Sequence, residues 1–341
     1  MTKRECVIAA LRHRATRYCP YHVRFTKAAL ERLQAATGEP AILERIGNHF
    51  AYQRTRRVDE EVEIRPGFFR DDFGVVWNRT ADRDTGVVEA YGLTPENIDR
   101  YPFPDPWAGG RFDQVAQGCR AHPELFKLAT QRFTLFERAW SLRGMENLLV
   151  DFASEPAFVD DLLDRIAAFD LAIVDEALKY PIDGYHFGDD WGQQTGLIMG
   201  PKLWRRFIKP RLAALFARVK QAGKFVSIHS CGDVREILPD LIEIGLDLFN
   251  PFQPEVMDVF QVKEEFGDRL AFWGGISTQK TMPFGTPAEV RAEVGEKIRR
   301  LGRDGGYICA PAHDLAADVP AANMLALIET LQEQEARGRA S

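Results

Sequence analysis

The chain has 341 residues, enough for one large α/β barrel or two smaller domains, and 45% of them are hydrophobic, which supports a sizeable core. Lysine and arginine number 44 against 50 acidic residues, so the formal charge is −6, and no basic stripe suggests a nucleic-acid partner. No run of about 20 apolar residues occurs, so no membrane span is expected.

The N-terminus is typical of an amphipathic helix and not of a signal peptide. Thr2 and Glu5 have the spacing of a capping box, in which each side chain satisfies a free backbone donor near the other residue. The five cysteines are an odd number spread over a long chain, which argues against a disulfide framework. We therefore expect a cytoplasmic protein whose cysteines pack, bind metal or act in catalysis.

The first 120 residues are less regular than the rest. Residues 19–25 are predicted to form the first strand of a barrel, and residues 71–77 and 86–91 resemble a hairpin laid over the barrel mouth. We expect one domain over residues 1–341, in which residues 1–120 include an irregular helical and hairpin extension over that mouth.

From about residue 125 onward, short apolar runs alternate with amphipathic helices. The predicted strands cover residues 126–130, 183–187, 225–229, 246–250, 270–273 and 307–309. The predicted helices cover residues 134–150, 157–180, 201–222, 234–245, 256–266, 287–301 and 321–335. This alternation indicates βαβ units, hence an α/β fold with a parallel sheet whose post-strand loops gather at one rim.

Three residues suggest a metal site at that rim. His229 and Cys231 stand two residues apart at the end of one predicted strand, and Cys309 lies on another. Residues i and i+2 of a strand point to the same face. One imidazole and two thiolates would make a three-ligand zinc site with an open position, as in catalytic zinc centres. The structural alternative is a strand-end histidine beside buried free thiols.

Further candidates follow other strands. Asp189 and Asp190 come after the strand that contains His186, and either could approach the metal or merely cap a turn. His313 could act as an acid or base or be satisfied by backbone. Substrate contacts are predicted for Arg24, Trp140, His186, Asp189, Trp191, Gln194 and Phe252, and catalytic roles for Asp190 and His313. The aromatic members could equally be barrel core.

Several motifs resemble the uroporphyrinogen decarboxylase superfamily over nearly the whole chain. They are Met1-Thr-Lys-Arg-Glu, Gly188-Asp-Asp-Trp-Gly-Gln-Gln, His229-Ser-Cys-Gly-Asp-Val, Trp273-Gly-Gly-Ile-Ser, and Gly305-Gly-Tyr-Ile followed by Pro311-Ala-His-Asp. The resemblance implies a (β/α)8 TIM-type barrel. It also implies one of two chemistries: cofactor-free decarboxylation of porphyrinogens, or zinc-dependent methyl transfer to or from corrinoid proteins.

Departures from the decarboxylase pattern favour the second chemistry. Of the arginine segment with which the decarboxylases hold substrate carboxylates, residues 23–27 keep only Arg24, and Trp140 stands where a tyrosine is expected. The methyltransferase branch uses His-X-Cys and a distant cysteine as zinc ligands, which His229, Cys231 and Cys309 match. His313 matches a decarboxylase histidine, so that branch stays open.

The resulting expectation is a zinc-dependent methyltransferase that moves a methyl group between a small methylated substrate or thiol and a corrinoid carried by a partner protein. The alternative is a metal-independent decarboxylase or lyase that uses Asp72 or Asp190 with His313. Neither nucleic acid nor membrane is expected as a partner. A homodimer is a candidate oligomeric state that the sequence does not decide.

Overall fold

The centre of the molecule is a parallel sheet of seven strands. The computed structural model describes residues 1–56, 60–81 and 86–340. In sheet order the strands are β1 (Phe50–Arg54), β6 (Phe126–Gln131), β7 (Gly184–Gly188), β10 (Phe225–His229), β11 (Leu248–Phe252), β12 (Ala271–Ile276) and β13 (Tyr307–Pro311). The chain passes through four small strands between β1 and β6 and through two more between β7 and β10, and otherwise neighbours in the sheet follow one another along the chain. Successive βα units of a barrel produce this strand order.

An eighth segment closes the sheet into a barrel. Tyr21 forms a parallel bridge with Cys309 of β13, and Phe25 forms one with Leu315. On its other side, the carbonyl of Tyr21 accepts a hydrogen bond from the backbone N–H of His49, just before β1. The segment predicted as the first barrel strand, residues 19–25, therefore takes that place through two isolated bridges and not as a regular strand, and the fold is the predicted (β/α)8 barrel.

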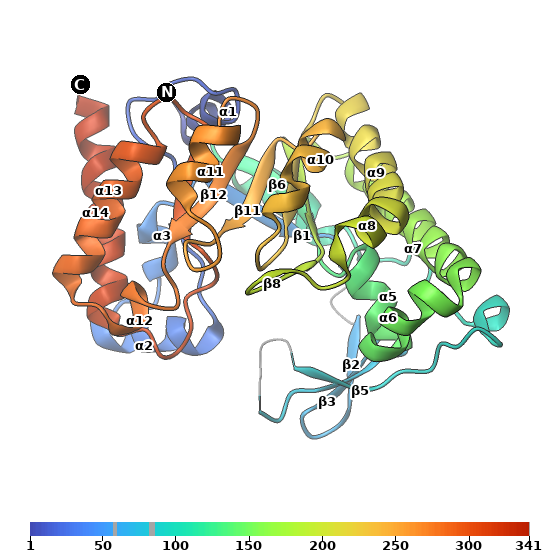
Figure 1. Cartoon of the computed structure of the whole chain (residues 1–341). Helices are drawn as coiled ribbons and strands as arrows, with labels where there is room; N and C mark the ends of the chain where they lie inside the picture. Colours follow the sequence, from blue (N-terminus) through green and yellow to red (C-terminus); the bar gives the residue numbers. More distant parts are fainter. Residues whose placement is uncertain (57–59, 82–85, 341) are drawn as a thin grey trace.

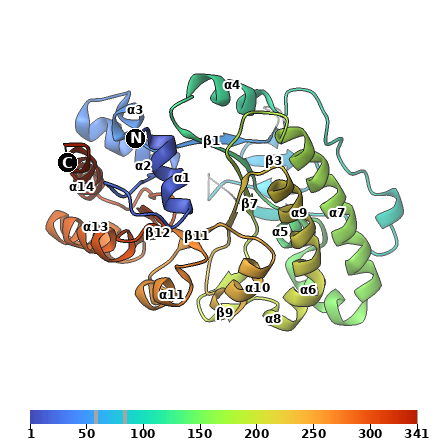
Figure 2. The same ribbon diagram turned by 90° about the horizontal axis from the view of Figure 1, so that it is seen from above.

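Helices surround the strands on the outside (Figures 1 and 2). The α-helices are α1 (Lys3–Leu11), α2 (Lys27–Thr37), α3 (Ile42–Ile46), α4 (Asp113–Ala121), α5 (Leu135–Arg143), α6 (Met145–Ser154), α7 (Pro156–Ala177), α8 (Gly200–Leu203), α9 (Lys209–Gln221), α10 (Leu238–Glu243), α11 (Val259–Phe266), α12 (Thr281–Phe284), α13 (Pro287–Leu301) and α14 (Ala321–Ala340). Single turns are η1 (Ile98–Arg100), the π-helical η2 (Trp204–Ile208) and η3 (Arg235–Ile237). Among the helices of the described residues, none combines the length and apolar character needed to cross a membrane.

The strands are buried on both faces, and alternate side chains enter two different cores. The lumen core takes, among others, Phe50, Leu128, Leu248, Trp273 and Ile308, and α1 packs against it with Val7, Ala10 and Leu11. The outer core lies between the strands and the surrounding helices. Because α1 plugs one end of the barrel, the opposite end, where the strands finish, forms the mouth.

A small antiparallel sheet lies beyond this mouth, below the barrel in Figure 1. Its strands are β2 (Glu61–Arg65), β3 (Phe68–Asp71), β4 (Val76–Asn78) and β5 (Val87–Ala90). The hairpin expected at residues 71–77 and 86–91 is part of it. The sheet follows β1, so it is an insertion after the second barrel strand and not an extension that precedes the barrel.

The structure differs from the predicted helices at three places. The helix expected over residues 134–150 breaks at Gly144, whose φ of +87° ends α5 and precedes α6. The helix expected over residues 201–222 contains the π-helical turn η2 just before Pro210. The last helix continues beyond residue 335, where Arg339 returns to the carboxylate of Glu335 at 2.8 Å.

Candidate metal and active site

His229, the last residue of β10, presents one defined nitrogen to the barrel mouth. Its Nδ1 lies 2.6 Å from Oδ1 of Asn250 on the neighbouring strand β11. The amide of Asn250 is itself fixed, because its Nδ2 donates to the carbonyl of Trp273 at 3.0 Å. Oδ1 is therefore the acceptor, so Nδ1 of His229 carries the proton and Nε2 has the free lone pair. Metal-binding histidines are oriented by this kind of contact.

Cys231 lies in the loop after β10, and its thiol contacts Nε2 of His229. Its Sγ lies 3.3 Å from Nε2 of His229. Its backbone N–H donates to Oδ1 of Asp190 at 2.8 Å, and its carbonyl accepts from the N–H of Gly192 at 3.1 Å. Gln253 accepts from the N–H of Gly232 at 2.7 Å. The loops after β7 and β11 thus hold the thiol in place.

The loop after β13 supplies a third donor, His313. Its ring centroid lies 5.7 Å from that of His229. Over the described ranges, ligand atoms of His229, Cys231 and His313 all lie within 4.8 Å of one another. Oδ1 of Asp190 is 3.7 Å from Nε2 of His229, so a carboxylate lies beside these three donors. The rim therefore carries two imidazoles and one thiol, with an oxygen donor close by.

Cys309, the predicted third ligand, is not part of this group, so the predicted grouping is corrected. Its strand neighbours Ile308 and Ala310 face the lumen. Because successive strand side chains alternate, Cys309 points to the outer core, where it is fully buried with Cys19 and Tyr307. His313 takes the place that the prediction gave to this thiol.

Burial disfavours charge on both members of the His229–Cys231 pair. It lowers the pKa of His229, opposed by the nearby carboxylate of Asp190. Burial also raises the pKa of Cys231, and Asp190 raises it further. Without a cation beside it, this thiol stays protonated at neutral pH. A bound metal ion is the kind of partner that would stabilise its thiolate.

Arg24 and His186, two predicted substrate-binding residues, lie with Tyr52 and Trp273 in the lumen. The guanidinium of Arg24 lies 4.5 Å from the ring centroid of Tyr52 and is 3.0 Å from the carboxylate of Asp314. The His186 ring packs 5.7 Å from Tyr52 and 5.4 Å from Trp273, between centroids. Burial lowers its pKa well below the ordinary value, so it is neutral. These side chains form an aromatic wall below His229.

Three predicted substrate-binding residues are fully buried and engaged in contacts within the protein. Asp189 is 0% exposed, and its carboxylate accepts from the N–H groups of Phe136 and Glu137 at the start of α5 and from Nε1 of Trp191. Trp191 is equally buried. Phe252 is 0% exposed and stacks on Phe272 in the outer core. All three are buried in these contacts, and their role as substrate-binding residues stays a prediction.

Trp140 and Gln194 lie in other surroundings. Trp140 on α5 packs against Trp77 of the antiparallel sheet and against Phe133, with centroids 6.3 and 6.4 Å away. Gln194 is exposed in the turn between β8 (Gly192–Gln193) and β9 (Gly196–Leu197). Their predicted contacts with substrate stay predictions.

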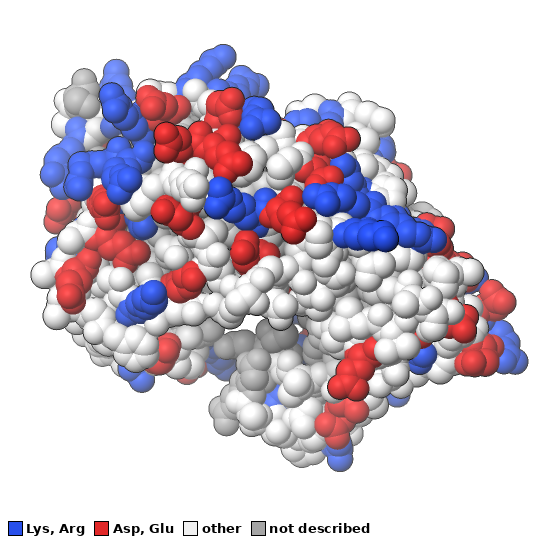
Figure 3. Space-filling model, viewed as in Figure 1, with Lys and Arg blue, Asp and Glu red and all other residues white. Residues whose placement is uncertain are grey.

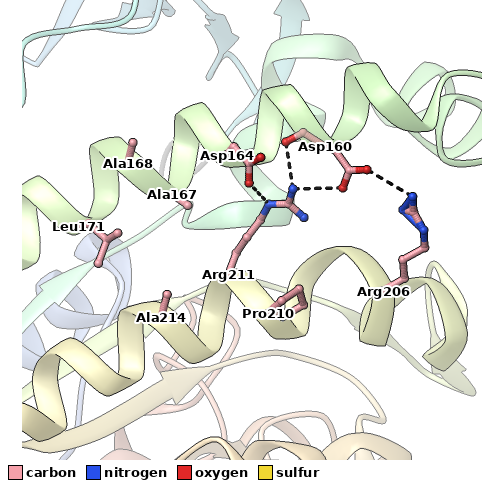
Figure 4. A pocket seen from close by; sticks show the side chains of 9 residues that line it. All are labelled: Asp160, Asp164, Ala167, Ala168, Leu171, Arg206, Pro210, Arg211 and Ala214. Atoms are coloured by element: carbon pink, nitrogen blue, oxygen red, sulfur yellow. Dashed lines mark hydrogen bonds and ion pairs between the residues drawn. The ribbon is translucent and has the colours of Figure 1, made fainter.

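The molecule is hollowed between the barrel and the antiparallel sheet (Figure 3). A separate groove lies in the outer helical layer, between α7 and α9 (Figure 4). There Arg211 donates to Asp164 at 2.7 Å and to Asp160 at 3.1 Å. These ion pairs occupy the polar groups of the groove, which holds none of the rim residues.

Comparisons with known proteins agree on one family. A family model described as uroporphyrinogen decarboxylase (URO-D) matches residues 74–334. The chain is 24% identical over 282 residues to the uroporphyrinogen decarboxylase of Chlorobaculum parvum, which covers 77% of this chain and 78% of that protein. It is 24% identical over 267 residues to a methylated-thiol–coenzyme M methyltransferase of Methanosarcina mazei, covering 75% and 67% respectively.

A solved structure described as a methyltransferase from Methanosarcina mazei shares the fold. It superposes with a TM-score of 0.75 and covers 98% of this chain and 99% of that chain, at 18% sequence identity. The likeness extends over the barrel together with its insertion.

Proposed function

Because the chain belongs to the uroporphyrinogen decarboxylase family, whose model matches residues 74–334, we propose that it is a zinc-dependent methyltransferase. It would move a methyl group between a small methylated substrate, such as a methyl ether, or a thiol, and a corrinoid protein. The observation that carries this proposal is the convergence of His229, Cys231 and His313 at the barrel mouth. The relative from Methanosarcina mazei named as a methyltransferase supports the reaction class.

The donor set fits zinc. Zinc takes nitrogen at about 2.0 Å and thiolate sulfur at about 2.3 Å, so two ligands in a tetrahedral site are separated by about 3.5 Å. Sγ of Cys231 and Nε2 of His229 are 3.3 Å apart. His229 offers the unprotonated nitrogen that a metal needs, because Asn250 holds the proton on the other one. Three protein ligands leave a position for substrate.

Zinc bound there would supply a Lewis acid that stabilises a thiolate or the oxygen or sulfur that a departing methyl group leaves behind. The residues of the chain do the rest. Asp190, whose Oδ1 accepts from the backbone of Cys231, is the nearest base to take up a proton that a thiol releases. The wall of Tyr52, His186 and Trp273 excludes water below the reacting group. Nothing in this arrangement requires His186 to be charged.

The corrinoid partner is part of the proposal through the methyltransferase branch that the sequence resembles. Such a partner would approach from the side of the hollow beside the antiparallel sheet (Figure 3). The second candidate function is metal-independent decarboxylation, favoured by the Chlorobaculum relative. It would use Asp190 with His313, since Asp72 is already engaged by Arg111 at 2.8 Å.

Metal analysis of purified variants tests the proposal. We expect about one zinc per chain in the wild type, as a three-ligand catalytic site implies. Cys231→Ala and His313→Ala should lose it, whereas Cys309→Ala should retain it, because Cys309 faces the outer core. Methyl transfer to free cob(I)alamin, followed by its absorbance, should fall with the zinc content.

The matched cysteine pair makes the experiment decisive about the ligands. Loss of zinc in Cys309→Ala with retention in His313→Ala would restore the ligand set expected from the sequence. A metal-free wild type that decarboxylates a carboxylated substrate would reject methyl transfer in favour of the second candidate.

A further inference from the structure

Arg54 is a lumen-facing arginine without an acidic partner. It is the last residue of β1, two positions after Tyr52 and four after Phe50, both of which face the lumen. Side chains two apart on a strand share a face, so Arg54 also points inward, at the mouth end. Its side chain makes no hydrogen bond or ion pair with any residue in the described parts of the chain. A partly buried charge of this kind costs free energy unless something compensates it.

Like charges surround it. Burial lowers the pKa of Arg54, and the positive charges of Arg56, Arg132 and Arg24 lower it further. Arg24 is paired with Asp314. Nε of Arg56 is buried without a hydrogen-bond partner among the described residues. The molecule as a whole carries −6, so this concentration of guanidinium groups is local and runs against the net charge.

The sheet register places these groups in a row that leads toward the metal site. Arg54 is paired with Thr130 of β6, and Thr130 is paired with His186 of β7. Oγ1 of Thr130 is buried and has no hydrogen-bond partner within the described ranges. Neighbouring strands are about 4.8 Å apart, so Arg54 and His186 are separated by about 10 Å along the sheet. The His186 ring is 6.4 Å from the His229 ring.

The next row contains Arg132 beside a glycine, Gly188. A Cβ on Gly188 would lie 3.4 Å from Cα of Arg132, so the two residues are neighbours across β6 and β7. Gly188 is in turn paired with His229. In this row, therefore, only Gly188, which has no side chain, lies between Arg132 and His229. A ligand in the mouth can reach both.

We propose that Arg54 and Thr130, with Arg132 at the rim, bind an oxyanion on the substrate, so that this enzyme acts on small anionic molecules. The guanidinium fork donates to the oxyanion in a bidentate manner, and the Thr130 hydroxyl supplies a further donor. Arg54 holds the anion about 10 Å along the sheet from His186, and the reacting group of the substrate points toward His229. The claim concerns binding and holds for methyl transfer or decarboxylation; only the choice of probe below rests on the proposed methyl transfer.

Isothermal titration with matched probes tests this site. The probes are 4-methoxybenzoate, 4-methoxybenzenesulfonate and the uncharged 4-methoxybenzamide, which share the ring and the methyl ether. We expect at least one acid to bind the wild type about tenfold or more tightly than the amide. Arg54→Gln should weaken binding of that acid by about 10- to 100-fold and leave the amide nearly unchanged. The two acids show whether a planar or a tetrahedral oxyanion is preferred.

Two controls separate recognition from general charge and from misfolding. Arg299→Gln removes one exposed positive charge from α13, away from the mouth, and should leave the affinity for the acids unchanged. Arg54→Lys keeps the charge but loses the fork and should give intermediate affinity. Arg54→Gln should melt at the same temperature as the wild type or higher, because it removes an unpaired charge. Equal binding of acids and amide, an unchanged affinity in Arg54→Gln, or no binding of either acid at millimolar concentration would overturn the proposal.

Discussion

A single amide decides which nitrogen of His229 is available at the rim. Asn250 donates to the carbonyl of Trp273 and accepts from Nδ1 of His229, so its own orientation and the histidine tautomer are linked. Sequence reasoning did not include Asn250, which stands as an ordinary polar residue in an apolar run. Its signal exists only in the register, which pairs it with His229.

Removal of this amide should weaken the metal site without unfolding the barrel. In Asn250→Ala, His229 can rotate and take either tautomer, so we expect zinc affinity to fall by about 10- to 100-fold, as for other partners of metal-bound histidines. Competition with a chromogenic chelator measures it. Asn323→Ala is the matched control, because Asn323 is also buried and bonds two carbonyls but lies near α12. An equal loss of affinity in both variants would contradict the role of Asn250.

The difference between Cys309 and His313 shows where sequence reasoning stops. His229 and Cys231 could be grouped because they are two residues apart at a strand end. Cys309 lies between Ile308 and Ala310, and a strand buried on both faces has no polar side to reveal which residues point inward. The sequence therefore predicted the strand and the rim, but not the face on which the thiol lies.

At the scale of elements, the loop that follows β10 and carries Cys231 contacts the backbone of β8 directly. Gly232 has a φ of +84°, and a Cβ there would lie 2.2 Å from the carbonyl carbon of Gly192. The two segments also exchange hydrogen bonds: Gly192 donates to Cys231, and Asp233 donates to Gln193 at 2.8 Å. The loop that carries Cys231 is thus locked to the β8–β9 hairpin, and only glycine permits the approach.

A methyl group at this contact should separate the two loops. We expect Gly232→Ala to destabilise the protein by about 2–4 kcal/mol, from the clash and the left-handed conformation together, and to reduce zinc binding because Cys231 moves. Urea unfolding measures the first effect and metal analysis the second. Gly223→Ala has a similar φ of +70° but open space around it. It should cost only about 1 kcal/mol and keep the metal, and similar losses in both variants would argue against the loop contact.

Regular elements with a local sequence signal were predicted, and elements that depend on pairing with a distant strand were not. Strands such as residues 225–229 were predicted with correct bounds, because apolar β-branched runs between amphipathic helices are a local signal. The strand β1 (Phe50–Arg54) was missed, and with it Arg54, since its sequence alternates without a strong apolar run. Its identity depends on pairing with β6, which no local pattern reports.

At the scale of the whole molecule, the barrel is closed by a seam between its first strand and β13. On the other side of the first strand, just before β1, His49 is 0% exposed, with its ring centroid 4.6 Å from that of Tyr21. Neither ring nitrogen has a hydrogen-bond partner among the described residues. Burial lowers its pKa from 6.5 to about 3, so the folded protein keeps this imidazole neutral.

The buried His49 should make the fold sensitive to acid. Below pH 6.5 the unfolded chain binds a proton at His49 that the folded chain does not bind, so stability is lost as the pH falls from 6.5 toward 3. At pH 5.5 this one residue should cost about 1.4 kcal/mol. His49→Phe should lose less stability than the wild type between pH 7.5 and 5.5 in urea unfolding. His122→Gln, at a half-exposed histidine, should behave like the wild type, and identical pH dependence in all three proteins would rule the mechanism out.

The seam between the first strand and β13 has a consequence for synthesis. The parallel bridge joins Tyr21 to Cys309, 288 residues later in the chain. At about 5–20 residues per second, the ribosome needs roughly 15–60 s to deliver the partner of the first strand. Throughout that interval a nascent chain carries an unpaired edge that other nascent chains could join. We therefore expect the yield of soluble protein to depend on growth temperature and chaperone supply more than the stability of the finished barrel would suggest.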